Sequence, residues 1–387
     1  MIKLDSQALL SKLIAFDTTS RTSNLELIDF VRNYLDGYGI VSTLLHNDAG
    51  DRANLYATIG PDDIGGILLS GHTDVVPVTG QAWDTDPYQL IEKDGLLYGR
   101  GSSDMKGFIA NVLTNVPKMT AKELTTPIHI ALSYDEEIGC VGAREMVEKL
   151  QSLEVKPKMG VIGEPTLMQS VIGHKGKRSF RVKFTGYSCH SAYIDDGVNA
   201  VEFAAHLVVF IQKMNEKILK RGMTDSGYSV KHSTFHTGSI NGGTVINIVP
   251  KDCQFDFEIR HLPQDDIVVL LDEIEHYAMN EILPKMQARN AASNIEFDTL
   301  SAYPGLHTHA DADCVKMACD LTSNPCTGEK VSFGTEAGLF EDFLDISCVV
   351  CGPGSIEQAH KPNEFISHGQ LIKGESFIHK LTQQCLA

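Results

Sequence analysis

The chain has 387 residues, of which 42% are hydrophobic and 21% are charged, and its formal net charge is −17. This length exceeds that of a usual single core, so we expect two domains. The composition is typical of a soluble globular protein. The acidic balance argues against nucleic acid or an anionic membrane surface as a partner.

Membrane spans and secretion are also disfavoured. No run reaches the roughly 18 consecutive apolar residues of a membrane span, and the N-terminal stretch lacks the basic-then-apolar order of a signal peptide. Nine cysteines, an odd number over a long chain, do not suggest a disulfide framework. Cys348 and Cys351 have C-x-x-C spacing inside an apolar run, which we interpret as core thiols. We therefore expect a protein of the reducing cytoplasm.

The first part of the chain alternates between helical and strand-like patterns. Amphipathic spacing predicts helices within 6–38 and over 105–116 and 143–150. Apolar or alternating runs predict strands at 40–45, 54–59, 128–133 and 159–162, and one that opens at residue 67. Helices that alternate with buried strands indicate an α/β domain with a mostly parallel sheet and helices on both faces.

The pattern changes near residue 173. Phe180, Val182 and Phe184 recur with a period of two, which is typical of a half-exposed antiparallel strand. Further strands are expected at 233–237, 253–259 and 295–300, with helices at 198–217 and 265–282 on one sheet face. Helices at 311–321 and 369–384 and a strand at 346–351 return to the α/β pattern. The sequence therefore predicts a main domain of residues 1–176 and 303–387, interrupted by an α+β insert of residues 177–302.

The apolar run Ile67–Leu69 is followed by the small and polar residues Ser-Gly-His-Thr-Asp at positions 70–74. His72 and Asp74 are two residues apart, so on a strand they point to the same face. This suits a metal ligand and the partner that orients it. The same pair can also be a simple hydrogen-bonded pair at the end of a strand.

Four more stretches place acidic residues or histidine after apolar runs. Asp104 stands among glycines before a predicted helix. It could be the N-cap of that helix or a carboxylate that bridges two cations. Asp135–Glu137 are successive carboxylates, which form either a solvated acidic loop or a cation site. Glu164 and His360 complete the set. Sites in α/β sheets lie at the carboxyl ends of strands, so these groups together indicate a pair of zinc or cobalt ions.

The chain carries a series of motifs in order: GHTDVVPV, LYGRGSSDMKG, DEEIG, GEPT, HKGKRSF, GYSCHSA, FEIRHLP, FGTEAG and GPGSIEQAHKPNEF. With these motifs it resembles the acetylornithine deacetylase branch of the dinuclear metal aminoacylase and carboxypeptidase superfamily. The resemblance covers essentially the whole chain. It implies that residues 1–176 and 303–387 form a catalytic metal-binding domain and that 177–302 form a lid through which a homodimer assembles.

Carried over to this sequence, the resemblance implies two divalent ions per chain, zinc or alternatively cobalt. The implied ligands are His72 and Glu164 for one ion and Glu137 and His360 for the other, with Asp104 bridging. Asp74 would orient His72. Glu136 would be the general base, since a carboxylate that binds no metal is free to accept a proton.

The remaining implied residues concern the substrate. His190 would stabilise the oxyanion across a dimer, or be an ordinary surface histidine. Asn247 and Arg260 would contact the substrate, although Arg260 could instead form a structural ion pair. Glu336 would meet a terminal ammonium, or be a plain loop carboxylate.

The activity implied by the resemblance is hydrolysis of the acetyl amide of α-N-acetyl-L-ornithine to ornithine and acetate, a step of arginine biosynthesis. One alternative is a related amidohydrolase acting on another acyl amino acid or on a dipeptide. A second is a binding protein that keeps the fold without catalysis. The complete set of five ligands with Glu136 argues against this last alternative.

Overall fold

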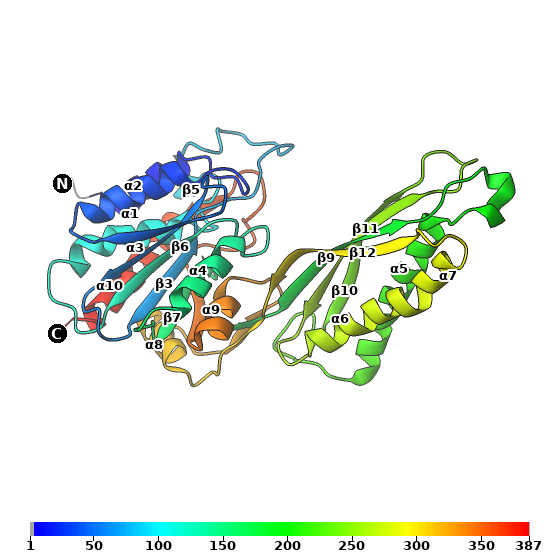
Figure 1. Cartoon of the computed structure of the whole chain (residues 1–387). Coiled ribbons are helices and arrows are strands. Elements are labelled where there is room, and N and C mark those ends of the chain that lie inside the picture. Colours follow the sequence, from blue (N-terminus) through cyan, green and yellow to red (C-terminus); the bar gives the residue numbers. More distant parts are fainter. Residues whose placement is uncertain (1–3, 387) are drawn as a thin grey trace. The chain divides into compact units, whose positions relative to one another are not determined.

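The computed structural model describes residues 4–386. The chain divides into two compact units, which are described separately (Figure 1). Unit 1 comprises Met1–His174, Leu306–Lys330 and Thr335–Ala387, and unit 2 comprises Lys175–Gly305 and Val331–Gly334. The N-terminal stretch considered above for a signal peptide is therefore described only from its fourth residue.

Unit 1 is built on a nine-stranded sheet in the order β1-β2-β6-β3-β7-β15-β8-β13, with β14 paired to β8. The central strands β6, β3, β7 and β15 are parallel, whereas β1, β2, β8 and β13 pair antiparallel with their neighbours at the edges. The strands are β1 (Ser42–His46), β2 (Ala53–Ile59), β3 (Ile67–His72), β6 (Ile128–Ser133), β7 (Met159–Pro165), β8 (Val171–His174), β13 (Leu306–His307), β14 (Glu329–Val331) and β15 (Ser347–Gly352). A smaller antiparallel sheet contains β4 (Ile91–Lys93), β5 (Leu96–Tyr98) and β16 (Phe365–Ser367).

Helices cover both faces of the large sheet. One face carries α1, α2, α3 and α10, and the other carries α4 and α9 (Figure 1). The helices of unit 1 are α1 (Ser6–Ile14), α2 (Leu25–Asp36), α3 (Lys106–Met119), α4 (Val141–Gln151), α8 (Asp313–Thr322), α9 (Ala337–Leu344) and α10 (His368–Gln384). The predicted α/β class is confirmed, with parallel pairing limited to the centre of the sheet.

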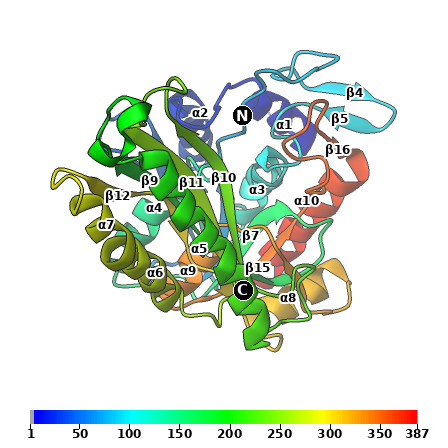
Figure 2. The same cartoon turned by 90° about the vertical axis from the view of Figure 1, so that its right-hand side faces the viewer.

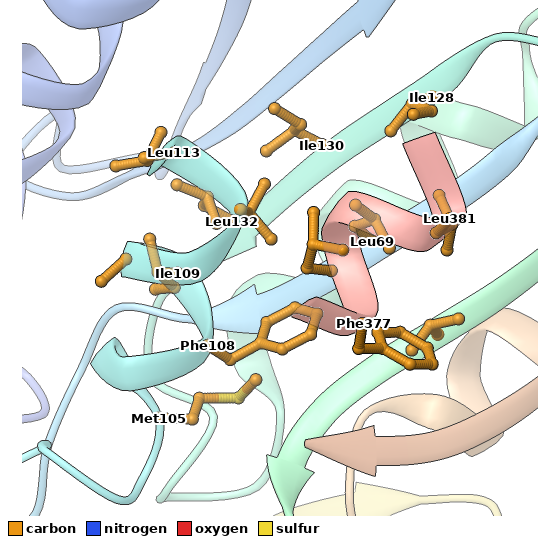
Figure 3. Packing of buried hydrophobic residues seen from close by; sticks show 14 of the residues in the cluster. Leu69, Met105, Phe108, Ile109, Leu113, Ile128, Ile130, Leu132, Phe377 and Leu381 are labelled. Carbon is orange, nitrogen blue, oxygen red and sulfur yellow. The ribbon is translucent and has the colours of Figure 1, made fainter. Parts of the chain in front are cut away.

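The core between the sheet and α3 and α10 determines which face of β3 is free for polar groups. Leu69 of β3 packs with Phe108 of α3 and Phe377 of α10 (Figure 3). A Cβ on Gly71 would lie 2.9 Å from the Met105 Cε atom, so glycine allows this close approach. Because side chains alternate along a strand, Ser70 and His72 point to the opposite face of β3.

Unit 2 is an antiparallel sheet with the order β10-β11-β9-β12. Its strands are β9 (Gly176–Thr185), β10 (Thr234–Gly242), β11 (Asp252–His261) and β12 (Asn294–Tyr303). Helices α5 (Ala200–Arg221), α6 (Ile267–His276) and α7 (Leu283–Gln287) lie on one face of this sheet (Figure 2). A 3-10 turn, η1 (Ser191–Asp196), and a π-helical turn, η2 (Tyr277–Ile282), complete the unit. The buried Phe180, Val182 and Phe184 confirm the predicted α+β character of this segment.

The cysteines agree with the sequence only in part. Seven cysteines are free, including the buried pair Cys348 and Cys351. Cys319 at the end of α8 is bonded to Cys326, seven residues further along the chain. The sequence did not indicate this bond, which forms because the chain turns back after α8 and brings the two Cα atoms within 5.6 Å. Within residues 4–386, no helix has the length and apolar character needed to cross a membrane.

Candidate metal centre

The carboxyl ends of the central parallel strands bring the predicted ligands together in unit 1. His72 ends β3, Glu136 and Glu137 follow β6, and Glu164 lies near the end of β7. Asp104 precedes α3, and His360 lies in the segment between β15 and β16. Parallel strands end at one edge of the sheet, so residues separated by almost three hundred positions can share one site.

Asp104 lies between two histidines. His72 Nε2 is 2.9 Å from Asp104 Oδ1, and His360 Nε2 is 3.4 Å from Asp104 Oδ2. His360 Nε2 is also 2.8 Å from Glu137 Oε2, whereas His72 Nε2 is 3.8 Å from Glu164 Oε1. Each Asp104 oxygen therefore faces a different histidine, which is the arrangement that a bridging carboxylate requires.

Among residues 4–386, two overlapping groups of side chains could hold a cation, with their donor atoms within 4.8 Å of one another. One group contains His72, Asp104 and Glu137, and the other contains His72, Glu136 and Glu164. Glu136 is thus close enough to act as a ligand itself, although the resemblance gives it a role in proton transfer. The position of His72 in both groups shows how compact the cluster is.

Asp74 joins two of the strand ends. Its backbone carbonyl is 2.9 Å from His72 Nδ1, closer than its carboxylate, which is 3.6 Å away. The carboxylate instead accepts hydrogen bonds from the backbone N–H groups of Glu136 at 3.0 Å and Glu137 at 3.3 Å, and from the Ser20 hydroxyl at 2.8 Å. Asp74 therefore orients the imidazole through its main chain and holds the Glu136–Glu137 turn through its side chain.

The electrostatics of the cluster indicate a shortage of positive charge. Burial and the neighbouring Glu137 and Asp74 carboxylates raise the pKa of Glu136 to about 8. Burial and the charge of Asp104 raise the pKa of Glu137 to about 7. Burial, Asp104 and Glu136 raise the pKa of Glu164 well above its usual range. These carboxylates would each favour a nearby cation.

The contacts between Asp104, Glu137 and the histidines shift pKa values so that the charged forms are favoured. Burial alone would raise the pKa of Asp104, but hydrogen bonds with His360 and His72 lower it. Hydrogen bonds with Asp104 and with Glu137 raise the pKa of His360 to about 10. Imidazole and carboxylate donors without a thiolate are the set that hydrolytic zinc-type ions prefer. The residues present therefore fit a pair of divalent ions, which would supply the missing positive charge.

Glu364 is a residue of this site that the sequence reading missed. It is 1% exposed, and its Oε1 atom accepts hydrogen bonds from the backbone N–H groups of Ser103 at 2.9 Å and Asp104 at 3.1 Å. Its Oε2 atom accepts from Gly101 N at 3.1 Å and pairs with Arg100 Nη1 at 2.7 Å. Glu364 thus supports the turn that presents Asp104. Its place in the last motif, four residues after His360, was the available signal.

Three of the four remaining predicted residues belong to unit 2. His190 is exposed, its Nδ1 atom accepts from Ala192 N at 3.0 Å, and it forms a β-bridge with Ile248. Asn247 is exposed beside it, and its carbonyl accepts from Ser191 N at 3.0 Å. The structure thus brings His190 and Asn247 together within this unit.

Arg260 is engaged on its own strand. Its Nε atom donates to Glu258 Oε1 at 2.9 Å, and Lys177 Nζ is 3.5 Å from Glu258 Oε2. The structural ion pair considered as an alternative for Arg260 is therefore present. Arg260 and Lys177 therefore share the carboxylate of Glu258.

Glu336 lies inside unit 1, with no exposed surface. Its two carboxylate oxygens accept hydrogen bonds from the hydroxyls of Ser70 at 2.5 Å and Ser133 at 2.6 Å. Contact with a substrate ammonium would require this fully buried carboxylate to become accessible. Ser70 and Ser133 were not singled out by the sequence reading, because a hydroxyl inside an apolar strand carries no distinctive pattern.

Comparison with known proteins supports this description. The model of Peptidase family M20/M25/M40 matches residues 68–384. The acetylornithine deacetylase of Pasteurella multocida is 32% identical over 372 residues, covering 95% of this chain and 92% of that protein. The acetylornithine deacetylase of Myxococcus xanthus is 32% identical over 380 residues, covering 96% and 95%.

Solved structures share the fold at lower identity. The M20 family metallo-carboxypeptidase Sso-CP2 of Sulfolobus solfataricus superposes with a TM-score of 0.74 at 18% identity, covering 98% of this chain and 99% of that one. Human carnosine dipeptidase 1 gives a TM-score of 0.68 at 18% identity, covering 97% and 96%.

Fold, site and comparisons agree on the class of protein. The chain belongs to Peptidase family M20/M25/M40. Within that family it is an enzyme, a hydrolase of the acetylornithine deacetylase type.

Proposed function

We propose that this enzyme hydrolyses the acetyl amide of α-N-acetyl-L-ornithine to ornithine and acetate, and so acts in arginine biosynthesis in the cytoplasm. The observation that carries the proposal is full-length similarity to acetylornithine deacetylases at 32% identity. The histidine and carboxylate cluster at the strand ends supports it, because amide hydrolysis at neutral pH needs an activated water.

We further propose that the cluster holds two divalent ions, zinc or alternatively cobalt. His72 and Glu164 would hold one ion, Glu137 and His360 the other, and Asp104 both. When bound, such ions polarise the amide carbonyl and lower the pKa of a water in the site. Asp74 would keep the imidazole of His72 in its ligating orientation through the 2.9 Å contact between its carbonyl and Nδ1.

Glu136 is proposed as the general base. It would accept a proton as water adds to the acetyl carbon, and it would then deliver that proton to the amine nitrogen as the carbon–nitrogen bond breaks. Its backbone N–H is fixed by the Asp74 carboxylate at 3.0 Å, which holds the start of its side chain in place. A carboxylate whose backbone is fixed beside the donor set suits this role.

Unit 2 is proposed as the lid and the dimerisation domain. In a homodimer, His190 of one copy would donate a hydrogen bond to the developing oxyanion in the other copy. Asn247 would add a polar contact, and Arg260 would bind the substrate carboxylate. Mixing His190→Ala with Glu136→Gln protein should then restore part of the activity, since one site in a mixed dimer keeps both groups. No recovery after proven subunit exchange would contradict the action across the dimer.

A hydrolysis screen tests the substrate. The purified enzyme should show its highest kcat/KM on N-acetyl-L-ornithine, compared with N-acetyl-L-norvaline, which lacks the terminal ammonium, N-succinyl amino acids and dipeptides. Metal content measured on the same sample should approach two ions per chain. A dipeptide as the best substrate would reject the deacetylase proposal while leaving the metal centre in place.

A further inference from the structure

Glu336 is a buried carboxylate whose two oxygens are both committed inside the protein. It immediately precedes α9 and has no exposed surface. The contacts from Ser70 Oγ at 2.5 Å and Ser133 Oγ at 2.6 Å have the short lengths of charge-assisted O–H···O⁻ hydrogen bonds. Burial raises the pKa of Glu336, and the two serine hydroxyls oppose that rise. A buried carboxylate is costly unless such donors satisfy it.

The two serines belong to the two strands that deliver the metal cluster. Ser70 is two residues before His72 on β3, so both side chains leave the same face of that strand. Ser133 ends β6, three residues before Glu136, and it is the register partner of His72 in the parallel pair of β3 and β6. The carbonyl of Ser133 also accepts from Thr73 N at 2.8 Å, just beyond β3. Glu336 therefore reaches both strands directly behind the cluster.

The geometry points to Glu336 as a positioning residue. We propose that its carboxylate holds the carboxyl ends of β3 and β6 in register through Ser70 and Ser133, and thereby keeps His72 and the Glu136–Glu137 turn at the spacing that metal binding and proton transfer need. This role requires no contact between Glu336 and the substrate. It rests on the hydrolase site described above and does not depend on which acyl amino acid is cleaved.

The test compares variants of the three residues with a control carboxylate in α9, the helix that follows Glu336. Glu341 of α9 accepts from His307 N and Thr308 Oγ1, each at 2.7 Å, and both of these partners lie outside β3 and β6. Glu336→Ala, Glu336→Gln, Ser70→Ala and Ser133→Ala are each measured beside Glu341→Gln. The readouts are kcat and KM on N-acetyl-L-ornithine and on N-acetyl-L-norvaline, Zn²⁺ affinity of the metal-stripped protein, and Tm.

We expect Glu336→Ala to lower kcat on both substrates by the same factor and to weaken Zn²⁺ binding, each by about 10- to 100-fold, as is usual for residues that support ligands. Glu336→Gln should recover part of both losses, since its amide oxygen still accepts one serine hydroxyl. The two serine variants should show smaller losses of the same kind. Adding either serine change to Glu336→Ala should cost little more, because their shared partner is already gone. Glu341→Gln should leave Zn²⁺ affinity and kcat unchanged.

Two results would overturn the proposal. A loss confined to KM for the ornithine substrate would make Glu336 a substrate contact. A lower Tm with unchanged kcat and Zn²⁺ affinity would make it a fold-stabilising residue only. If Glu336→Ala does not fold, the serine variants and Glu336→Gln decide by the same criteria. Failure of the wild-type enzyme on acetylornithine would refute the proposed substrate alone, since Zn²⁺ affinity and kcat on its best substrate still test the positioning role.

Discussion

The two units treat their acidic side chains in opposite ways. On the open face of the unit 2 sheet, Arg181 pairs with Asp256 at 2.8 Å and Lys183 pairs with Asp298 at 2.6 Å, all partly exposed. At the strand ends of unit 1, Asp104, Glu137 and Glu164 have side chains that are at most 7% exposed, and in the described part of the chain their ion-pair partners are histidines.

The difference follows from sheet type. Antiparallel strands place residues of opposite charge side by side along their length, so each carboxylate finds a cation locally. Parallel strands that are buried on both faces keep their interiors apolar, and their polar groups accumulate where the strands end. The charge pairs on the open face of the unit 2 sheet therefore support the sheet itself. At the edge of the parallel sheet, the carboxylates of Asp104, Glu137 and Glu164 pair with histidines, and such a donor set favours a metal ion.

The largest effect is expected at the residue between the two histidines. Asp104→Ala should remove ligands from both proposed ions at once, so bound metal should fall from about two ions per chain to nearly none, with turnover abolished. His72→Ala and His360→Ala should each lose about one ion. The bound metal is measured in each purified variant and in Asp256→Ala, a control in unit 2 that should keep its full metal content. Full metal content in Asp104→Ala would contradict the bridging role.

A smaller effect is expected where the carboxylate moves a proton. Glu136→Gln should lower kcat by about 10²- to 10⁴-fold, which is the usual contribution of a general base, with bound metal and KM largely kept. Single-turnover kinetics with metal analysis would separate this loss from a loss of metal. An equal loss of metal and turnover would instead assign Glu136 to the ligand set, where its distance from His72 and Glu164 also permits it.

A third effect concerns a buried titratable group whose hydrogen-bond partners are hydroxyls. His129 of β6 contacts the hydroxyls of Tyr56 at 2.9 Å and Thr58 at 3.0 Å, and burial lowers its pKa to about 4. The unfolded chain therefore binds a proton before the folded chain does, so stability is lost as the pH falls below about 6.5. Between pH 7 and pH 5 this costs roughly 2 kcal/mol, from about 1.4 kcal/mol per pKa unit.

Urea unfolding at the two pH values measures this cost. His129→Gln keeps a hydrogen-bonding side chain without the titration, so its stability should fall by about 2 kcal/mol less than that of the wild type over this range. His46→Gln, at an exposed position of the same unit, is the control and should follow the wild type. Identical pH dependence in His129→Gln and wild type would show that His129 is accessible to protons in the folded state.

The smallest effect is expected on the open face of unit 2. Arg181→Ala removes a partner of Asp256 at an exposed position, where water can replace it, so Tm should change little. The change should be smaller still at high salt, because salt screens the lost attraction. Its kcat/KM and metal content should match those of the wild type. Thermal unfolding at low and high salt, beside the activity assay, checks this outcome. A large loss of activity would mean that the paired charges of unit 2 do more than support the sheet.

Local patterns in the sequence determined much of this protein. Residues a few positions apart define the period of Phe180, Val182 and Phe184, and the apolar run that ends in His72. Such patterns depend on the geometry of one strand or helix, so they predicted the α/β class, the α+β insert and the strand ends where acidic groups gather. The motifs then named candidates for each role around those ends.

Partners distant in sequence were decided by the tertiary structure alone. Glu336 lies 266 residues from Ser70 and 203 from Ser133, and no periodicity links such positions. The support of Asp104 by Glu364 likewise depends on where the chain returns after a strand. The bond between Cys319 and Cys326 joins residues only seven positions apart, but it too depends on how the chain turns after α8. Packing of the elements selects which buried polar groups meet, because each must find a hydrogen-bond partner in the space that the fold leaves for it.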